Sequence, residues 1–280
     1  MIIKLTDDFD LQKIADSGQC FRVRTFEDGT YRFITEDQLL YIKKVDDEMY
    51  DISCSEELWI KIWYPYFDLD RSYSEVRGRI GSRDKYMLSA AENGLGIRIL
   101  RQDPWEMLIT FIISQQKTIP AIKSAVEILS ANYGTLLPSD REEIYSFPTP
   151  KQLSGITGEI LREYKLGYRA PYILDAVRQV LSGKLDLHAL ASRSDRKLFE
   201  ALKQVNGVGE KVSNCICLFA YGRTRLAPVD TWIKKVIDQK YKGKNPFPKY
   251  KDGAGIMQQY IFYYAQTHKD EFQKNYLRNG

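Results

Sequence analysis

Two short segments in the last third of the chain constrain its fold and chemistry most. One spans residues 204–212 and contains Gly207, Val208 and Gly209; the other spans residues 227–230. The two glycines give the backbone the freedom that a tight turn needs, so we expect a hairpin between two helices. Such a turn opens onto a helix N-terminus, whose free N–H groups suit a phosphate. A helix–helix turn without a ligand is the alternative.

Lys211 and Asp230 are the candidate catalytic residues. Lys211 falls in the first turn of the second helix, where the helix dipole disfavours a cation and makes a neutral, nucleophilic amine easier to hold. The alternative is a solvated lysine, the usual environment of this residue. Asp230 follows a proline break and is a candidate carboxylate partner. It is equally suited to cap the next helix, and both roles stay open because a capping carboxylate is also a fixed one.

These residues resemble the helix-hairpin-helix and Gly/Pro…Asp signature of the base-excision DNA glycosylases. Members with a lysine at this position combine base removal with strand cleavage, and among them the chain is most similar to 8-oxoguanine DNA glycosylase/AP lyases. Four further segments match in family order: residues 17–22, 66–70, 100–104 and 166–170. The resemblance therefore covers most of the chain, and it implies double-stranded DNA containing 8-oxoguanine as the partner.

The resemblance also implies how the damaged base is recognised. The carbonyl of Gly18 would accept the hydrogen on N7, which 8-oxoguanine has and guanine lacks. Cys215 would stack on the base and Gln266 would read its Watson–Crick edge. The family's second stacking residue, an aromatic, falls at Asp270, with Phe272 nearby. An ordinary loop glycine and a small buried core cysteine are the alternatives for Gly18 and Cys215.

The resemblance further implies three residues that contact the DNA where the damaged base has left the helix. Gln116 aligns with the family's asparagine that fills the space left by that base. Tyr168 aligns with the family's aromatic wedge, and Arg169 with an arginine that contacts the opposite cytosine. A second cytosine-reading arginine of many relatives falls at Ala121. Losing one charged donor relaxes discrimination by about 1–3 kcal/mol for a good contact, so we expect a weaker cytosine preference. Otherwise Tyr168 and Arg169 are a loop before a helix.

The composition indicates an ordinary globular protein with a mild net charge of +4. That charge fits a nucleic-acid binder without demanding one. The densest apolar run, residues 107–113, has the length of a core helix and is too short for a membrane span. The N-terminus becomes acidic too early for a signal peptide. We therefore expect a monomeric protein with no membrane contact, in the cytoplasm, on nucleoid DNA if prokaryotic.

The four cysteines, Cys20, Cys54, Cys215 and Cys217, are too few and too scattered for a disulfide framework. No Cys/His group has zinc or iron–sulfur spacing. Some relatives with the same hairpin carry a four-cysteine iron–sulfur cluster near the C-terminus, but no cysteine follows Cys217 here. We predict no metal and no cofactor.

The periodicity predicts an α+β fold, in which a small N-terminal antiparallel β-sheet domain (residues 1–79) precedes an all-helical body containing the helix-hairpin-helix motif (residues 80–280). Aromatic and β-branched residues separated by turn signals predict four strands. They span residues 20–25, 31–34, 38–45 and 49–53. Apolar residues at helical spacing predict helices over 104–113, 120–132, 171–181, 195–204, 211–220, 231–240 and 256–274.

Three other functions compete with this interpretation. A glycosylase for alkylated purines uses the aspartate but typically lacks the lysine, so Lys211 argues against it, as does Gly18 in its context. A non-catalytic helix-hairpin-helix DNA-binding module would need the turn and a basic surface only, and would leave Lys211 and Asp230 without a purpose. A protein unrelated to nucleic acids fails to explain the ordered family segments.

Overall fold

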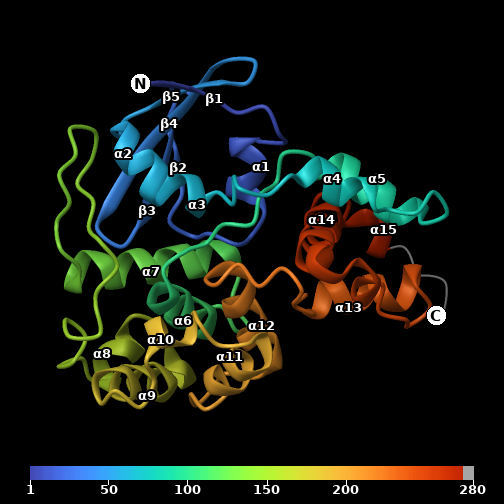
Figure 1. Cartoon of the computed structure of the whole chain (residues 1–280). Coiled ribbons are helices and arrows are strands. Elements are labelled where there is room, and N and C mark those ends of the chain that lie inside the picture. Colours follow the sequence, from blue (N-terminus) through green and yellow to red (C-terminus); the bar gives the residue numbers. More distant parts are fainter. Residues whose placement is uncertain (274–280) are drawn as a thin grey trace.

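The N-terminal part of the chain forms a five-stranded antiparallel sheet in the order β1-β5-β4-β3-β2 (Figure 1). The computed structural model describes residues 1–273. The strands are β1 (Ile2–Lys4), β2 (Arg24–Thr25), β3 (Tyr31–Thr35), β4 (Gln38–Asp46) and β5 (Met49–Ile52). Phe33 of β3 lies opposite Leu40 of β4, and both side chains are fully buried on the face that carries the core.

The first predicted strand is wrong over most of its length. A strand was expected over residues 20–25, but pairing with β3 occurs only at Arg24 and Thr25. The preceding segment passes between two cores, because Cys20 is buried with the sheet and Phe21 with the helices. β1, which was not predicted, pairs with β5 at the edge of the sheet.

One face of the sheet is covered by short helical elements. These are α1 (Leu11–Asp16), α2 (Glu56–Leu58), the π-helix η1 (Trp59–Trp63) and α3 (Tyr64–Tyr66). Their apolar side chains form one core with those of the strands. The main members are Leu11, Ile14, Phe33, Leu40, Ile42, Trp59, Trp63, Tyr66 and Phe67. Edge-to-face contacts among the aromatic rings, such as Phe33 on Phe67, give this core its specificity.

The first group of body helices packs around α6 (Pro104–Ile113). Every residue of α6 after Pro104 is buried, as expected for a helix that is apolar on nearly all sides, with Glu106 and Thr110 as its polar members. Asp103 caps α6 by accepting from two backbone N–H groups, so the predicted helix over 104–113 is confirmed. The group also contains α7 (Ile119–Tyr133), α8 (Gly158–Glu163), η2 (Gly167–Arg169), α9 (Ala170–Leu181), α10 (Leu187–Leu190), α11 (Asp195–Leu202) and α12 (Glu210–Phe219).

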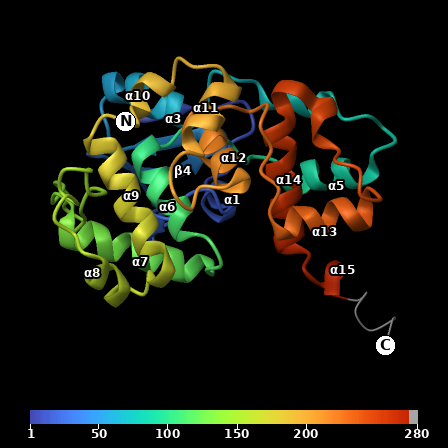
Figure 2. The same ribbon diagram turned by 90° about the horizontal axis from the view of Figure 1, so that it is seen from below.

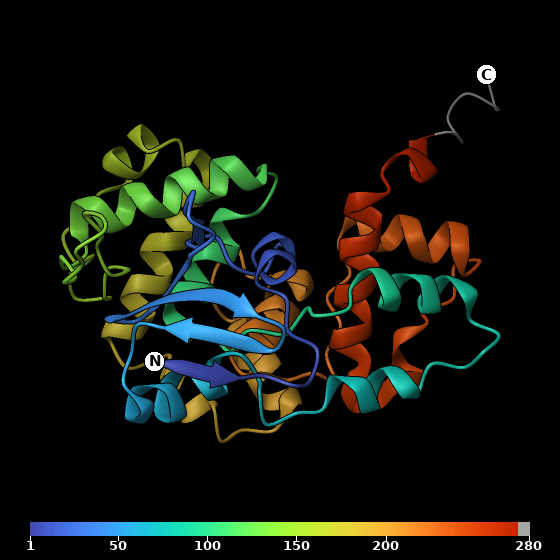
Figure 3. The same cartoon turned by 90° about the horizontal axis from the view of Figure 1, so that it is seen from above.

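A second group of helices stands beside the first (Figures 2 and 3). It is built from two distant stretches of the chain. The stretches contain α4 (Tyr73–Gly78) and α5 (Lys85–Asn93), then α13 (Thr231–Lys240), η3 (Phe247–Gly253), α14 (Ala254–Thr267) and α15 (Asp270–Gln273). The long helix α14 packs against both α5 and α13, which ties the C-terminal stretch to the earlier one.

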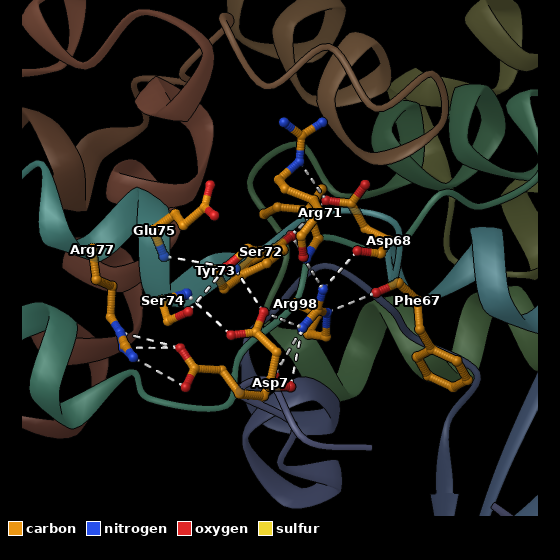
Figure 4. Close-up of polar contacts among 12 residues, drawn as sticks. Asp7, Phe67, Asp68, Arg71, Ser72, Tyr73, Ser74, Glu75, Arg77 and Arg98 are labelled. Carbon is orange, nitrogen blue, oxygen red and sulfur yellow. Dashed lines mark hydrogen bonds and ion pairs between the residues drawn. The ribbon is translucent and has the colours of Figure 1, made fainter. Parts of the chain in front are cut away.

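The sheet and the second helical group are joined by Arg98, whose side chain is buried (Figure 4). Its guanidinium donates to five backbone carbonyls, those of Asp7, Asp8, Phe67, Asp68 and Arg71. The same group lies 4.1 Å from the centroid of the Tyr73 ring at the start of α4. One side chain therefore satisfies carbonyls from two separate segments, residues 7–8 and 67–71.

The predicted α+β class is confirmed, and six helices lie close to their expected bounds. The last predicted helix, over 256–274, is wrong in its continuity: α14 ends at Thr267, the backbone of His268 leaves the helical region, and α15 starts at Asp270. Lys274 lies outside the described residues. The division of the chain after residue 79 stays a prediction.

Candidate active site

A cleft of about 1080 Å³ opens where the two helical groups meet the loop around Gly18. Its walls come from the end of α6, the start of α7, the first turns of α12 and α13, and α14. Five of the predicted site residues line it: Gly18, Gln116, Lys211, Asp230 and Gln266. The fold thus brings together residues from the beginning, middle and end of the chain.

The hairpin between α11 and α12 has the turn that its glycines predict. Gly207 has a φ of +82°, and a Cβ added there would clash with the Tyr172 ring of α9. This position therefore requires glycine for both conformation and space. Gly209 is the exposed N-cap of α12 and provides no side-chain acceptor, while Val208 is buried and anchors the turn. The first N–H groups of α12 are consequently available to an anion.

A buried aspartate supports this hairpin from behind. Oδ2 of Asp175 in α9 accepts from the backbone N–H of Asn206 over 3.0 Å and from Gln179 over 2.7 Å. Gln179 also donates to the carbonyl of Gln204 over 3.1 Å. Sequence analysis missed Asp175, because its function depends on α9 packing behind the turn.

Lys211 is the second residue of α12, is half-buried and lines the cleft. Its Nζ lies 5.4 Å from the centroid of the Phe111 ring, which itself stacks on Phe219. The aromatic ring therefore lies beside the lysine side chain on the wall of the cleft.

Asp230 is the N-cap of α13, and its Oδ1 accepts from the backbone N–H of Ile233 over 2.8 Å. The capping role is confirmed. The carboxylate also lines the cleft, so it is a negative charge held in a fixed orientation on the same cavity as Lys211. Two helix N-termini, those of α12 and α13, therefore frame the two candidate catalytic groups.

Cys215 lies one turn after Lys211 in α12 but is only 3% exposed and does not line the cleft. Burial raises the pKa of its thiol, and the charge of Lys211 partly opposes that rise. The thiol is therefore held in its neutral form close to the lysine, beneath the wall of the cleft.

The loop that carries Gly18 is fixed on both sides. Gly18 has a φ of +75°, and a Cβ there would lie 2.8 Å from Cε1 of Phe262 in α14. The carbonyl of the preceding Ser17 accepts from Gln259, also in α14. The Gln19 amide spans the other side, accepting from the Leu100 N–H over 2.7 Å. The loop is therefore pinned between the sheet domain and α14.

Gln266 faces the cleft one turn after Phe262 in α14, and sequence analysis missed Phe262. Phe272 does not line the cleft: it is buried against Trp232 with ring centroids 6.3 Å apart. Asp270 is exposed at the start of α15. The aromatic faces at the cleft come instead from Phe262 and Trp232, together with Phe21 and Phe111. An aromatic four residues before Gln266 was the available sequence signal.

The predicted wedge residues lie beside the cleft and are held by a residue that sequence analysis missed, Gln115. Tyr168 is 47% exposed, whereas Arg169 is buried with its guanidinium 4.3 Å from the Tyr168 ring centroid. Nε of Arg169 donates to the Gln115 carbonyl over 3.0 Å, and the Gln115 side chain donates to the Gly207 carbonyl over 3.1 Å. Gln115 thus links the hairpin to the wedge, and the next residue, Gln116, has a positive φ of +51°.

Within residues 1–273, no group of three or more His, Cys, Asp or Glu side chains is placed to hold a metal ion. None of the described helices combines the length and apolar character that a bilayer span requires.

Comparison with known proteins identifies the family. Residues 1–108 match the model described as 8-oxoguanine DNA glycosylase, N-terminal domain. Residues 109–252 match the HhH-GPD superfamily base excision DNA repair protein model. The chain belongs to the HhH-GPD superfamily of base excision DNA repair proteins.

Individual relatives agree with this assignment. The chain superposes on MBOgg1, solved in complex with a low-affinity DNA ligand, with a TM-score of 0.90 at 35% identity, covering 96% of both chains. It superposes on the Clostridium acetobutylicum 8-oxoguanine glycosylase/lyase bound to dsDNA, which has cytosine opposite 8-oxoG, with a TM-score of 0.87 at 35% identity. That match covers 96% of this chain and 98% of the other. The N-glycosylase/DNA lyase of Saccharomyces cerevisiae is 33% identical over 63% of this chain. The match covers half the length of the yeast enzyme.

Proposed function

We propose that this protein excises 8-oxoguanine from double-stranded DNA and then cleaves the abasic strand. The observation that carries the proposal is that Lys211 and the helix-capping Asp230 line one cleft with Gly18 and Gln266. The match of residues 1–108 to the 8-oxoguanine glycosylase N-terminal model supports the choice of damaged base.

The proposed chemistry starts from the neutral amine of Lys211. The amine attacks C1′ of the damaged nucleotide, the C1′–N9 bond breaks with its electron pair going to the base, and the base takes up a proton. The resulting amine loses a proton and opens the sugar ring to a Schiff base. Removal of a C2′ proton then expels the 3′ phosphate, which cleaves the strand. Water hydrolyses the Schiff base and restores Lys211.

Asp230 contributes charge in this scheme. Positive charge develops on the sugar as the glycosidic bond breaks, and a fixed carboxylate in the cleft stabilises it. The carboxylate is also suited to accept a proton from the Lys211 ammonium. Because Asp230 is oriented by its bond to the Ile233 N–H, it needs no rearrangement to act.

The remaining residues position the DNA. Backbone N–H groups of the hairpin at Gly207 and Gly209 hold a phosphate, a contact that fixes register without reading sequence. The Val208 N–H donates to the Val205 carbonyl over 3.0 Å, so Val208 contributes by shaping the turn.

Gly18 and Gln266, which line the cleft, recognise the extruded base. Cys215 lies beneath the cleft wall, so its contact with the base requires that wall to move.

Gln116 and the exposed Tyr168 occupy the gap. Arg169 is buried and donates to the Gln115 carbonyl, so its contact with the opposite base requires that bond to break. With Ala121 in place of a second arginine, the preference for opposite cytosine is weak.

The test is borohydride trapping on a labelled duplex with one 8-oxoguanine opposite cytosine. The wild type is expected to form a covalent adduct that Lys211→Gln does not form. Lys234→Gln is the matched control, because Lys234 lines the same cleft but is exposed and paired with Asp238. A duplex with undamaged guanine tests the choice of lesion.

Two other results would assign the protein to a different class. Base release without a trapped adduct would indicate an aspartate-driven glycosylase of the alkylated-purine type. Neither base release nor adduct would leave a DNA-binding module. We further predict that the enzyme works as a monomer in the cytoplasm, on nucleoid DNA if prokaryotic, with no metal or organic cofactor.

A further inference from the structure

Two loops beside the cleft are joined by hydrogen bonds and together carry three cations. They are residues 115–117, between α6 and α7, and residues 165–169, between α8 and α9. Nζ of Lys117 donates to the Lys165 carbonyl over 2.9 Å. Nε of Arg169 donates back to the Gln115 carbonyl over 3.0 Å. The two loops are thus one unit, with Lys117 on the cleft wall.

The cations of this unit face one another without acidic partners. Among residues 1–273, Lys117 and Arg169 donate to backbone carbonyls, and no carboxylate lies within ion-pair distance of them or of Lys165. Partial burial lowers the pKa of Lys117, and the like charges of Arg169 and Lys165 lower it further. An ammonium has three donors, so two remain on Lys117 for a ligand. Binding of an anion lowers the electrostatic repulsion among these three cations.

Lys165 is the exposed cation of this unit. Its φ of +60° belongs to the turn that ends α8, where the Leu166 N–H donates to the Leu161 carbonyl over 3.0 Å. The side chain is exposed and makes no ion pair within the described part of the chain. Its charge is therefore available to an anion outside the protein.

We propose that Lys117 and Lys165 bind a backbone phosphate of the DNA strand opposite the damaged base. The inference rests on the proposed function, in which Gln116, Tyr168 and Arg169 enter the duplex from these same two loops. A residue that contacts the opposite base lies close to the backbone of that strand, where phosphate oxygens accept most protein–DNA hydrogen bonds.

This contact explains how the chain manages without an arginine at Ala121. A phosphate contact carries affinity but no base information, so it holds the undamaged strand equally well whichever base faces the lesion. Binding strength is kept while discrimination is relaxed.

The test measures the salt dependence of binding in the Lys211→Gln background, where no turnover occurs. Duplexes carry 8-oxoguanine opposite each of the four bases. Removing one phosphate contact lowers the slope of log K against log salt by about 0.9. We expect Lys117→Gln and Lys165→Gly each to weaken binding roughly five- to ten-fold at low salt, by the same factor for all four opposite bases, with a shallower slope.

Three variants separate charge from structure. Lys165→Gly removes the charge while placing the residue best suited to φ +60°, so lost binding cannot come from backbone strain. Lys117→Arg keeps the charge and is expected to retain the wild-type slope. Lys61→Gln, at an exposed lysine of η1 that does not line the cleft, is expected to change neither slope nor affinity.

Two outcomes overturn the inference. An unchanged salt slope in both Lys117→Gln and Lys165→Gly shows that no phosphate is bound there. A loss confined to one opposite base shows that a lysine reads a base instead. The proposed function is judged separately, since failure of the wild type to release 8-oxoguanine refutes that function without reference to either lysine.

Discussion

Gly18 lies at a positive φ beneath the ring of Phe262, and both features exclude any larger residue. We predict that Gly18→Ala displaces the loop from α14, because the added Cβ would lie 2.8 Å from a ring carbon packed in the cleft wall. Single-turnover excision of 8-oxoguanine should fall at least about ten-fold, because a misplaced carbonyl loses the contact that we propose identifies the lesion. Rapid-quench assays at saturating enzyme measure this.

Gly29→Ala is the matched control. Gly29 has a similar φ of +81°, but a Cβ there meets no atom within 4 Å. It carries the same backbone strain, about 1 kcal/mol, without the clash, so its melting temperature should fall while excision is kept. Equal losses of excision in the two variants would show that strain, and not the position of the loop, is responsible.

At the residue scale, predictability depended on whether a residue acts through its own chemistry or through its neighbours. Lys211 and Asp230 stand in a motif whose spacing marks them, and the structure places both on one cleft. Gln115 and Asp175 act by hydrogen-bonding segments far away in the sequence, so nothing local reveals them. Phe272 was considered because it is aromatic and close to Asp270, but it packs inward against α13.

At the scale of the element, α6 carries a buried acid inside an otherwise apolar helix. Burial raises the pKa of the Glu106 carboxyl from its usual 4.5 to about 7, against the opposing charge of Arg22. The folded protein therefore holds a proton that the unfolded chain releases between about pH 4.5 and 7. Folding stability contributed by this group falls as pH rises through that window and stays low above it.

Glu106→Gln is predicted to remove this dependence. The variant should gain stability relative to wild type above pH 7, by an amount of the order of 3 kcal/mol, and differ little at pH 4.5. Urea denaturation at several pH values measures the difference. Glu92→Gln, at an exposed site of α5, should follow the wild-type curve. A Glu106→Gln curve parallel to wild type would refute the assignment.

Helices and strands were predictable where a single hydrophobic period describes the whole segment. The helix over residues 104–113 has a capping aspartate, a proline at its first position and an unbroken apolar run, and it forms as expected. Residues 20–25 have strand-forming side chains, but Cys20 and Phe21 belong to different cores and the segment is bent between them. A hydrophobic period describes one buried face, so it gives the wrong structure for a segment whose side chains pack into two cores.

At the scale of the whole molecule, Arg98 holds the sheet against the second helical group. We predict that Arg98→Met lowers the free energy of unfolding by about 3–5 kcal/mol, because it leaves five carbonyls of two segments without a donor. Chemical denaturation measures this. Arg79→Met, which breaks an exposed ion pair with Asp252, should cost less than about 1 kcal/mol. Comparable losses in both variants would contradict a joining role for Arg98.

The second helical group is closed by α14, which packs on α5 although more than half of the chain lies between them. Contacts between such distant stretches form slowly and require most of the polypeptide to be present. During synthesis, the hairpin with Lys211 is made before α14. The Gly18 loop is made much earlier, but its contacts with Phe262 and Gln259 form only after α14 has been synthesised. The proposed capacity to select a damaged base is therefore the last property this chain acquires, and an unfinished chain carries Lys211 before the walls of its cleft are complete.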